Sequence, residues 1–228
     1  MSVKSLPDSE QLLDRVVEAE VLSFLDEELA VTGSFQKEIE RSADRVDELD
    51  SDELRETVAS ATGSTAEADT LLEVSEKVPA IVPEYLALIH QTDLSHTERL
   101  RTLPFLDRLI ESPRTEGVPE AFVPVSGERL PFYAALHNTA IVYVWREECP
   151  PCDRVREIFD DIFDDPPDDM ALLSVYGPDS ATKLHEWYDI VGGPATVFFY
   201  QGSPEARMYG AYERSTFEKE IERHRNIE

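Results

Sequence analysis

The spacing of apolar residues changes character once along this chain, between residues 112 and 127. Before this point, apolar side chains recur every three to four positions, as on one face of an α-helix. The stretch 112–127 has no such period and contains three prolines and two glycines. After it, short apolar runs alternate with amphipathic stretches, which is typical of an α/β layer fold. We therefore predict an all-helical domain over 1–112, a linker or domain-entry segment over 113–127, and an α/β domain over 128–228.

The first part is predicted to contain five or six helices. Residues with capping side chains and helix-ending glycines define their limits, as in the possible capping box Ser64 to Glu67 and the stop at Gly63. The long acidic stretch that starts at Ser9 is expected to continue as one helix to Gly33. The further predicted helices are 34–49, 51–63, 64–78, 84–91 and 95–112.

The second part is predicted to contain a central sheet flanked by helices. Continuous apolar runs with many β-branched and aromatic residues indicate buried strands. The predicted strands are 140–145, 171–176, 195–200 and 206–210. The predicted helices are 153–163, 181–188 and 215–225.

The charge of the chain is strongly negative and evenly distributed. It has 48 acidic residues, 21 lysines and arginines, and a formal net charge of −27. Such a surface repels phosphate backbones and anionic lipids, so we expect neither nucleic acid nor a membrane as a partner. A uniform acidic coat with few lysines resembles the proteins of salt-loving archaea, and an ordinary acidic protein is the alternative.

No export or membrane segment is expected. The first residues, MSVKSLPDSEQ, contain neither an apolar core of signal-peptide length nor a twin-arginine pair. The longest apolar stretches fall far short of the roughly 18 residues that a membrane helix requires. We therefore expect a cytoplasmic protein.

The two cysteines, Cys149 and Cys152, lie three positions apart at the junction of a predicted strand and a predicted helix. In a reducing cytosol this spacing indicates catalysis or metal binding rather than structural cross-linking. A cysteine at a helix start lies near free backbone N–H groups, which favour the thiolate, so Cys149 is the candidate nucleophile. Pro150 suits the first helical position and Pro151 stiffens the turn. Cys152 is then the buried resolving thiol.

This arrangement resembles the thioredoxin family over about residues 121–228. The family has a strand, a Trp, three residues, Cys-x-Pro-Cys and a helix, which match Trp145 and the sequence Cys149-Pro150-Pro151-Cys152. A second match is Gly193-Pro194 before a strand pair. The resemblance implies that Pro194 is cis and that its loop binds substrate. It also implies redox chemistry on protein clients with disulfides and a thioredoxin-reductase-like electron donor, without a cofactor or a metal.

The sequence departs from the family around the thiols. Tyr143 occupies the position of a buried Asp that accepts the proton of the resolving thiol, and Val175 occupies that of its lysine partner. A phenol with an ordinary pKa near 10 is a poor base at neutral pH, so Tyr143 is interpreted as core packing. Glu148, flanked by Glu147, replaces the usual aromatic residue, and carboxylates beside a thiol oppose thiolate formation.

Several alternatives remain open. The cysteines could form half of a zinc site with His185 and His224, or an inert disulfide. Trp145 could be a core residue of its strand or the floor of the active site. The glycines Gly192 and Gly193 could make a tight turn or allow another backbone to approach closely. A thioredoxin-fold adaptor or redox-sensing interaction protein is the alternative to an enzyme.

The net charge generates a prediction about salt. At molar salt the Debye length is about 3 Å, whereas at 0.01 M it is about 30 Å and the carboxylates repel one another across the molecule. The melting temperature, followed by circular dichroism, should therefore rise with sodium chloride concentration. A melting temperature that stays constant from low to molar salt would contradict the halophilic interpretation.

Overall fold

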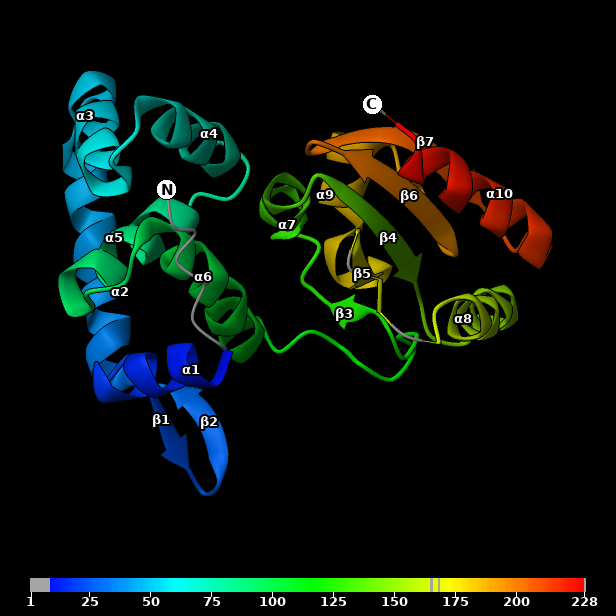
Figure 1. Cartoon of the computed structure of the whole chain (residues 1–228), viewed down its shortest axis with the longest axis horizontal. Coiled ribbons are helices and arrows are strands. Elements are labelled where there is room, and N and C mark those ends of the chain that lie inside the picture. The colour runs from blue at the N-terminus through cyan, green and yellow to red at the C-terminus, as the bar shows by residue number, and fades with distance from the viewer. Residues whose placement is uncertain (1–8, 165, 168, 228) are drawn as a thin grey trace, which may run out of the picture. The chain divides into compact units, whose positions relative to one another are not determined.

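The protein divides into two compact units, Met1–Ile110 and Glu111–Glu228 (Figure 1). The computed structural model describes residues 9–164, 166–167 and 169–227. Within these residues, no helix combines the length and the apolar character that crossing a bilayer requires.

The first unit is built around a buried central helix. Every residue of α5 from Ile81 to Leu88 is buried, and this helix contacts α2, α3 and α4. Local capping defines the helix limits: Asp50 forms a capping box with Glu53, and Gly63 ends α3 with φ of 82°. The helices are α1 Ser9–Glu18, α2 Gly33–Glu48, α3 Ser51–Thr62, α4 Thr65–Ser75, α5 Ile81–Gln91 and α6 His96–Glu111.

A β-hairpin corrects the prediction of an all-helical first domain. The helix expected over 9–33 ends at Glu18, and β1 (Leu22–Leu25) pairs with β2 (Glu28–Val31) in antiparallel register. The turn residues Asp26 and Glu27 have φ of 52° and 70°, in the left-handed region that a right-handed helix cannot contain. Apolar residues on both sides of this turn satisfied a helical period as well as a strand period, so periodicity alone misassigned them.

The second unit contains a mixed five-stranded sheet. The strand order is β3-β5-β4-β6-β7, with β4 at the centre, parallel to β5 and antiparallel to β6. Tyr143 of β4 is paired with Ser174 on one side and Thr196 on the other. The strands are β3 Val123–Pro124, β4 Thr139–Trp145, β5 Ala171–Tyr176, β6 Ala195–Tyr200 and β7 Ser203–Tyr209.

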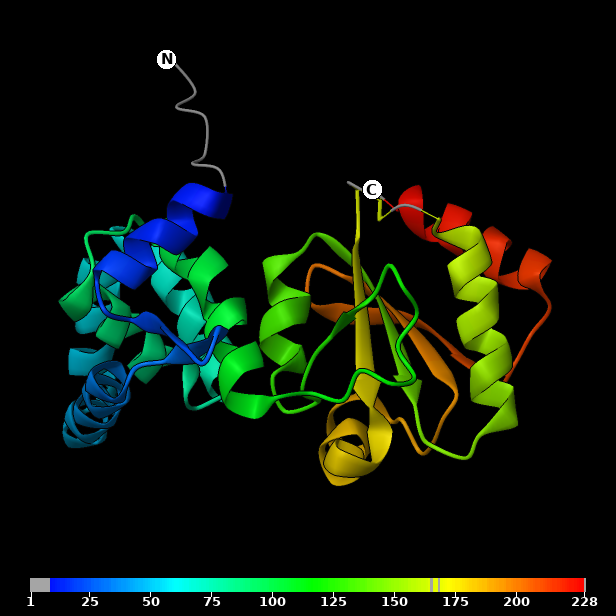
Figure 2. The same cartoon turned by 90° about the horizontal axis from the view of Figure 1, so that it is seen from below.

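Helices cover both faces of this sheet (Figure 2). Helices α8 and α10 pack on one face through an aromatic cluster that includes Phe159 and Phe217. Helices α7 and α9 pack on the other face through residues such as Tyr133 and Leu184. The helices are α7 Leu130–Leu136, α8 Pro150–Ile162, α9 Ala181–Tyr188, preceded by the 3-10 turn η1 Gly177–Ser180, and α10 Arg214–Arg225.

The predicted elements of the second unit are largely found, with several differences, among them the short strand β3, which lies within the predicted linker or domain-entry segment. Helix α8 begins at Pro150 rather than at Asp153, because both prolines occupy its first turn. Strand β7 begins at Ser203, earlier than expected. Helix α7 was not predicted, because seven residues are too few to show a helical period.

The buried His224 generates a prediction about pH. Its side chain is fully buried, and its Nε2–H donates to the carbonyl of Phe199 at 2.9 Å, whereas Nδ1 has no partner among the described residues. Burial lowers the pKa of His224, so the unfolded chain binds the proton at a higher pH than the folded protein does. Above the unfolded pKa of about 6.5, His224 is neutral in both states and costs no stability. As the pH falls below this value, the unfolded chain takes up the proton first, and the free energy of unfolding decreases.

Urea unfolding of the wild type and of His224→Gln should show this difference. The variant is expected to lose about 1 kcal/mol at pH 8, through poorer packing, and to lose less additional stability than the wild type between pH 7 and pH 5.5. Equal losses over that range in both proteins would show that His224 does not titrate on unfolding.

Candidate active site

At the start of α8, a backbone N–H group lies within hydrogen-bond distance of the sulfur of Cys149. Cys149 is the N-cap residue, and Pro150 and Pro151, which carry no backbone N–H, fill the first two helical positions. The first available donor is therefore the N–H of Cys152, which donates to the carbonyl of Cys149 at 2.8 Å and also lies 3.2 Å from its Sγ. A donor at this place, together with the positive end of the helix dipole, stabilises negative charge on that sulfur once the pair is reduced.

The two cysteines form a disulfide and are both buried. The S–S distance is 2.08 Å and the Cα atoms are 5.2 Å apart. Cys149 is 4% exposed and Cys152 is 3% exposed, so neither sulfur is open to solvent in this disulfide-bonded form. The reason is that both side chains belong to the same apolar cluster as Trp145.

Trp145 is a core residue that also borders the site. It is 3% exposed, contacts Tyr176 edge to face at 4.9 Å between ring centroids, and lies in the cluster with both cysteines. The backbone of Gly117 lies against its ring, because a Cβ atom at residue 117 would lie 2.4 Å from Cε3 of the indole. Only glycine allows this contact without displacement.

The loop before β6 lies beside the end of β4. The Gly193–Pro194 peptide bond is cis, as predicted. A Cβ atom at Gly193 would lie 3.1 Å from the carbonyl oxygen of Val144 and 3.3 Å from the Cα of Trp145, so a close backbone approach requires glycine there. Gly192 has open space around it and makes no such approach. The structure thus brings this loop to the strand that leads into residues 146–149, the cysteine loop between β4 and α8.

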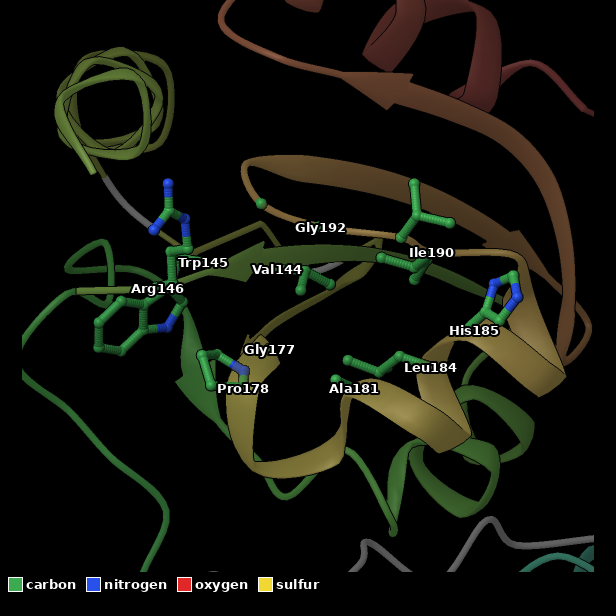
Figure 3. Close-up of a pocket in the computed structure, with 12 residues that line it drawn as sticks. Val144, Trp145, Arg146, Gly177, Pro178, Ala181, Leu184, His185, Ile190 and Gly192 are labelled. Carbon is green, nitrogen blue, oxygen red and sulfur yellow. The ribbon is translucent and has the colours of Figure 1, made fainter. Parts of the chain in front are cut away.

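A pocket of about 340 Å³ opens beside this loop (Figure 3). Its wall is mainly apolar, and Cys149 and Cys152 are not part of it. The pyrrole edge of Trp145 is turned toward Gly177 and Pro178 (Figure 3), and its Nε1 has no hydrogen-bond partner among the described residues. The residues that line the pocket include Val144, Trp145, Pro178, Leu184, Ile190 and Gly193.

Tyr143 holds the first turn of α8. It is fully buried, and its hydroxyl donates to the backbone carbonyl of Cys152 at 2.8 Å. Burial raises the pKa of the phenol further above its ordinary value near 10, so the hydroxyl keeps its proton at neutral pH. The geometry therefore favours a structural role for Tyr143 over a role as proton acceptor.

An arginine that the sequence did not single out reaches the cysteine loop. Arg114 forms an ion pair with Glu147 and a longer one with Asp179, at 3.7 Å from its Nε, and its guanidinium lies 4.4 Å from the centre of the Tyr176 ring. Glu148 is exposed and has φ of 50°. Arg114 and Gly117 belong to the segment without periodicity, so no local pattern marks either residue.

The histidines of the possible zinc site lie elsewhere. His224 is buried against Phe199, and His185 on α9 lies 3.7 Å from Asp189. Within the described part of the chain, no group of three or more histidine, cysteine or acidic residues is arranged to hold a metal ion.

No protein family and no curated protein matches this chain. Solved thioredoxin structures resemble about half of it. The match with a thioredoxin from Malassezia sympodialis has 22% identity and a TM-score of 0.41, and covers 45% of this chain and 91% of that one. A mutant thioredoxin from Halobacterium salinarum has 17% identity and a TM-score of 0.41, with 50% and 97% covered. Oxidised thioredoxin from Plasmodium falciparum has 21% identity and a TM-score of 0.40, with 45% and 97% covered.

The hydrogen bond of Tyr143 generates a prediction. Tyr143→Phe removes the donor to the Cys152 carbonyl and should lower the free energy of unfolding by about 1 kcal/mol in urea titrations. The rate of disulfide reduction should change by less than about threefold, because the protonated phenol does not accept the thiol proton. A hundredfold lower rate with an unchanged circular dichroism spectrum would show that the hydroxyl takes part in proton transfer.

Proposed function

We propose that this protein is a cytoplasmic thiol–disulfide oxidoreductase that acts on protein clients. One observation carries the proposal: Cys149 and Cys152 form a disulfide at the N-terminus of α8, where the N–H of Cys152 is shared between the carbonyl and the sulfur of Cys149. In the reduced protein this donor favours a thiolate on Cys149, and the thiolate is the form that attacks disulfides.

The proposed reaction begins with attack of the Cys149 thiolate on one sulfur of a client disulfide. A new S–S bond joins Cys149 to the client, and the other client sulfur leaves as a thiolate and takes a proton from water. Cys152 then loses its proton and attacks the sulfur of Cys149, which releases the second client thiolate. The client gains an electron pair and a pair of protons, and the protein keeps the Cys149–Cys152 disulfide until a thioredoxin-reductase-like donor reduces it.

The surroundings of the disulfide support a polypeptide substrate. The Gly193–Pro194 loop lies beside the end of β4, where an extended client segment could form backbone hydrogen bonds with it. The neighbouring pocket of about 340 Å³ has room for an apolar client side chain. Backbone contacts with one apolar anchor give affinity without strong sequence preference, which suits an enzyme with several clients.

A second candidate function is an adaptor or redox sensor with little or no turnover. The burial of both cysteines in the disulfide form favours it, because a client must reach the Cys149 sulfur, which is only 4% exposed. In that case the thiols would change state with the redox potential of the cell, and a partner would bind only one of the two states.

Turnover of a protein disulfide distinguishes the two functions. With dithiothreitol as electron donor, the full-length protein should accelerate the reduction of insulin over the uncatalysed rate, and Cys149→Ser should abolish the acceleration. Cys152→Ser should accumulate mixed disulfides with insulin, visible on non-reducing gels, because the resolving thiol is missing.

The matched controls are the two single serine variants, each of which removes one sulfur from the same turn. Mixed disulfides that accumulate on Cys149→Ser instead would reverse the roles of the two cysteines. Absence of both acceleration and mixed disulfides, in a protein that reduces and reoxidises normally, would favour the sensor or adaptor.

A further inference from the structure

We propose that Arg114 is a positioning residue for the thiol pair: it fixes Glu147 of the cysteine loop and compensates its charge, and so sets the reactivity of Cys149. This inference rests on the proposed thiol–disulfide function and names a regulator of that same site. It concerns a residue far from the cysteines in sequence, in the segment between α6 and β3.

Three contacts hold the guanidinium of Arg114 at the site. It pairs with Glu147, two residues before Cys149, and its Nε lies 3.7 Å from the carboxylate of Asp179 in η1. Its Cζ also lies over the ring of Tyr176, 4.4 Å from the ring centre, which is within the range of a cation–π contact. Arg114 therefore links the cysteine loop to the ends of β5 and η1.

The chain that follows Arg114 packs on the face of the sheet that α8 covers. Gly117 lies directly against the indole of Trp145, and the N–H of Glu120 donates to Asp160 of α8 at 2.7 Å. Phe122 then stacks on Phe159 of α8, with 5.0 Å between ring centroids. These contacts anchor the chain three to eight residues beyond Arg114 and so keep this segment next to the strand that leads into the cysteine loop.

The charge around Cys149 is unfavourable to a thiolate without Arg114. The cysteine loop carries Arg146, Glu147 and Glu148, the first turn of α8 carries Asp153, and η1 carries Asp179. Arg114 adds one cation to this set, and Arg154, Arg156, Glu157, Asp160 and Asp161 follow further along α8. Carboxylates outnumber cations in this set, and each one raises the cost of forming a thiolate nearby. Arg114 neutralises Glu147 in a direct ion pair and partly offsets Asp179.

The expected effect is modest and depends on salt. The side chains of Arg114 and Glu147 are 48% and 47% exposed, so solvent screens the pair. At low ionic strength we expect the removal of the arginine charge to move the titration midpoint of Cys149 upward by about 0.3 to 0.5 pH unit, about a two- to threefold lower thiolate fraction near neutral pH. At molar salt the Debye length is about 3 Å and the shift should shrink toward zero.

The test is the pH dependence of alkylation of Cys149 by iodoacetamide, in the full-length, reduced Cys152→Ser protein. In this background Cys149 is the single thiol, so the rate reports its thiolate directly. At 0.02 M salt, Arg114→Gln should raise the midpoint and Glu147→Gln should lower it. The double variant should return close to the starting value, and Arg114→Lys, which keeps the charge, should shift the midpoint less than Arg114→Gln.

Arg225→Gln is the matched control, because Arg225 pairs with Asp169 just before β5, at the end of the sheet opposite the cysteine loop. It should leave the midpoint unchanged. Two outcomes would overturn the proposal: no shift with Arg114→Gln at low salt, or a double variant whose midpoint stays as high as that of Arg114→Gln alone.

Alkylation requires no client and no turnover, so this result is separate from the insulin assay. An Arg114 shift that cancels with Glu147→Gln supports the positioning role even if insulin is not reduced, and failure in the insulin assay would then count against the oxidoreductase alone. Conversely, insulin reduction with no Arg114 shift would support the oxidoreductase function and contradict the role of Arg114 as a positioning residue.

Discussion

The burial of β4 on both faces is the constraint on which the second unit depends. All residues from Ala140 to Trp145 are buried, and the strand uses its backbone groups on both sides, toward β5 and β6. A central strand of this kind cannot shift register without moving its whole apolar set. Its C-terminal end is therefore a fixed point, from which the cysteine loop leaves and against which Gly193 packs.

The start of α8 then determines which sulfur receives help from the backbone. A helix normally offers several free N–H groups at its N-terminus, but Pro150 and Pro151 remove the first two. The N–H of Cys152 becomes the first donor, and its direction toward Cys149 makes the two cysteines unequal in chemistry although they are almost equally buried. Tyr143 stabilises this turn, because its hydroxyl donates a hydrogen bond to the carbonyl of Cys152.

Much of the second unit was predictable because its information is local. Continuous apolar runs defined β4, β5 and β6, and the strand-to-helix placement of the two cysteines defined the site. The hairpin at 22–31 was misassigned because its turn consists of Asp26 and Glu27. Glycine or asparagine is the usual sequence signal of a left-handed turn, and neither occurs there. Arg114 and Gly117 could not be found from the sequence, because their importance arises only when the segment folds back onto Trp145 and Glu147.

Two kinds of force act on the site, and they differ in range. The contacts of Gly117 with Trp145 and of Tyr143 with Cys152 are short-range and are not weakened by dissolved ions. The balance between Arg114 and the carboxylates of the loop is Coulombic and falls with ionic strength. In a chain with a net charge of −27, salt thus leaves the geometry of the disulfide in place while it reduces the electrostatic cost of a thiolate among carboxylates.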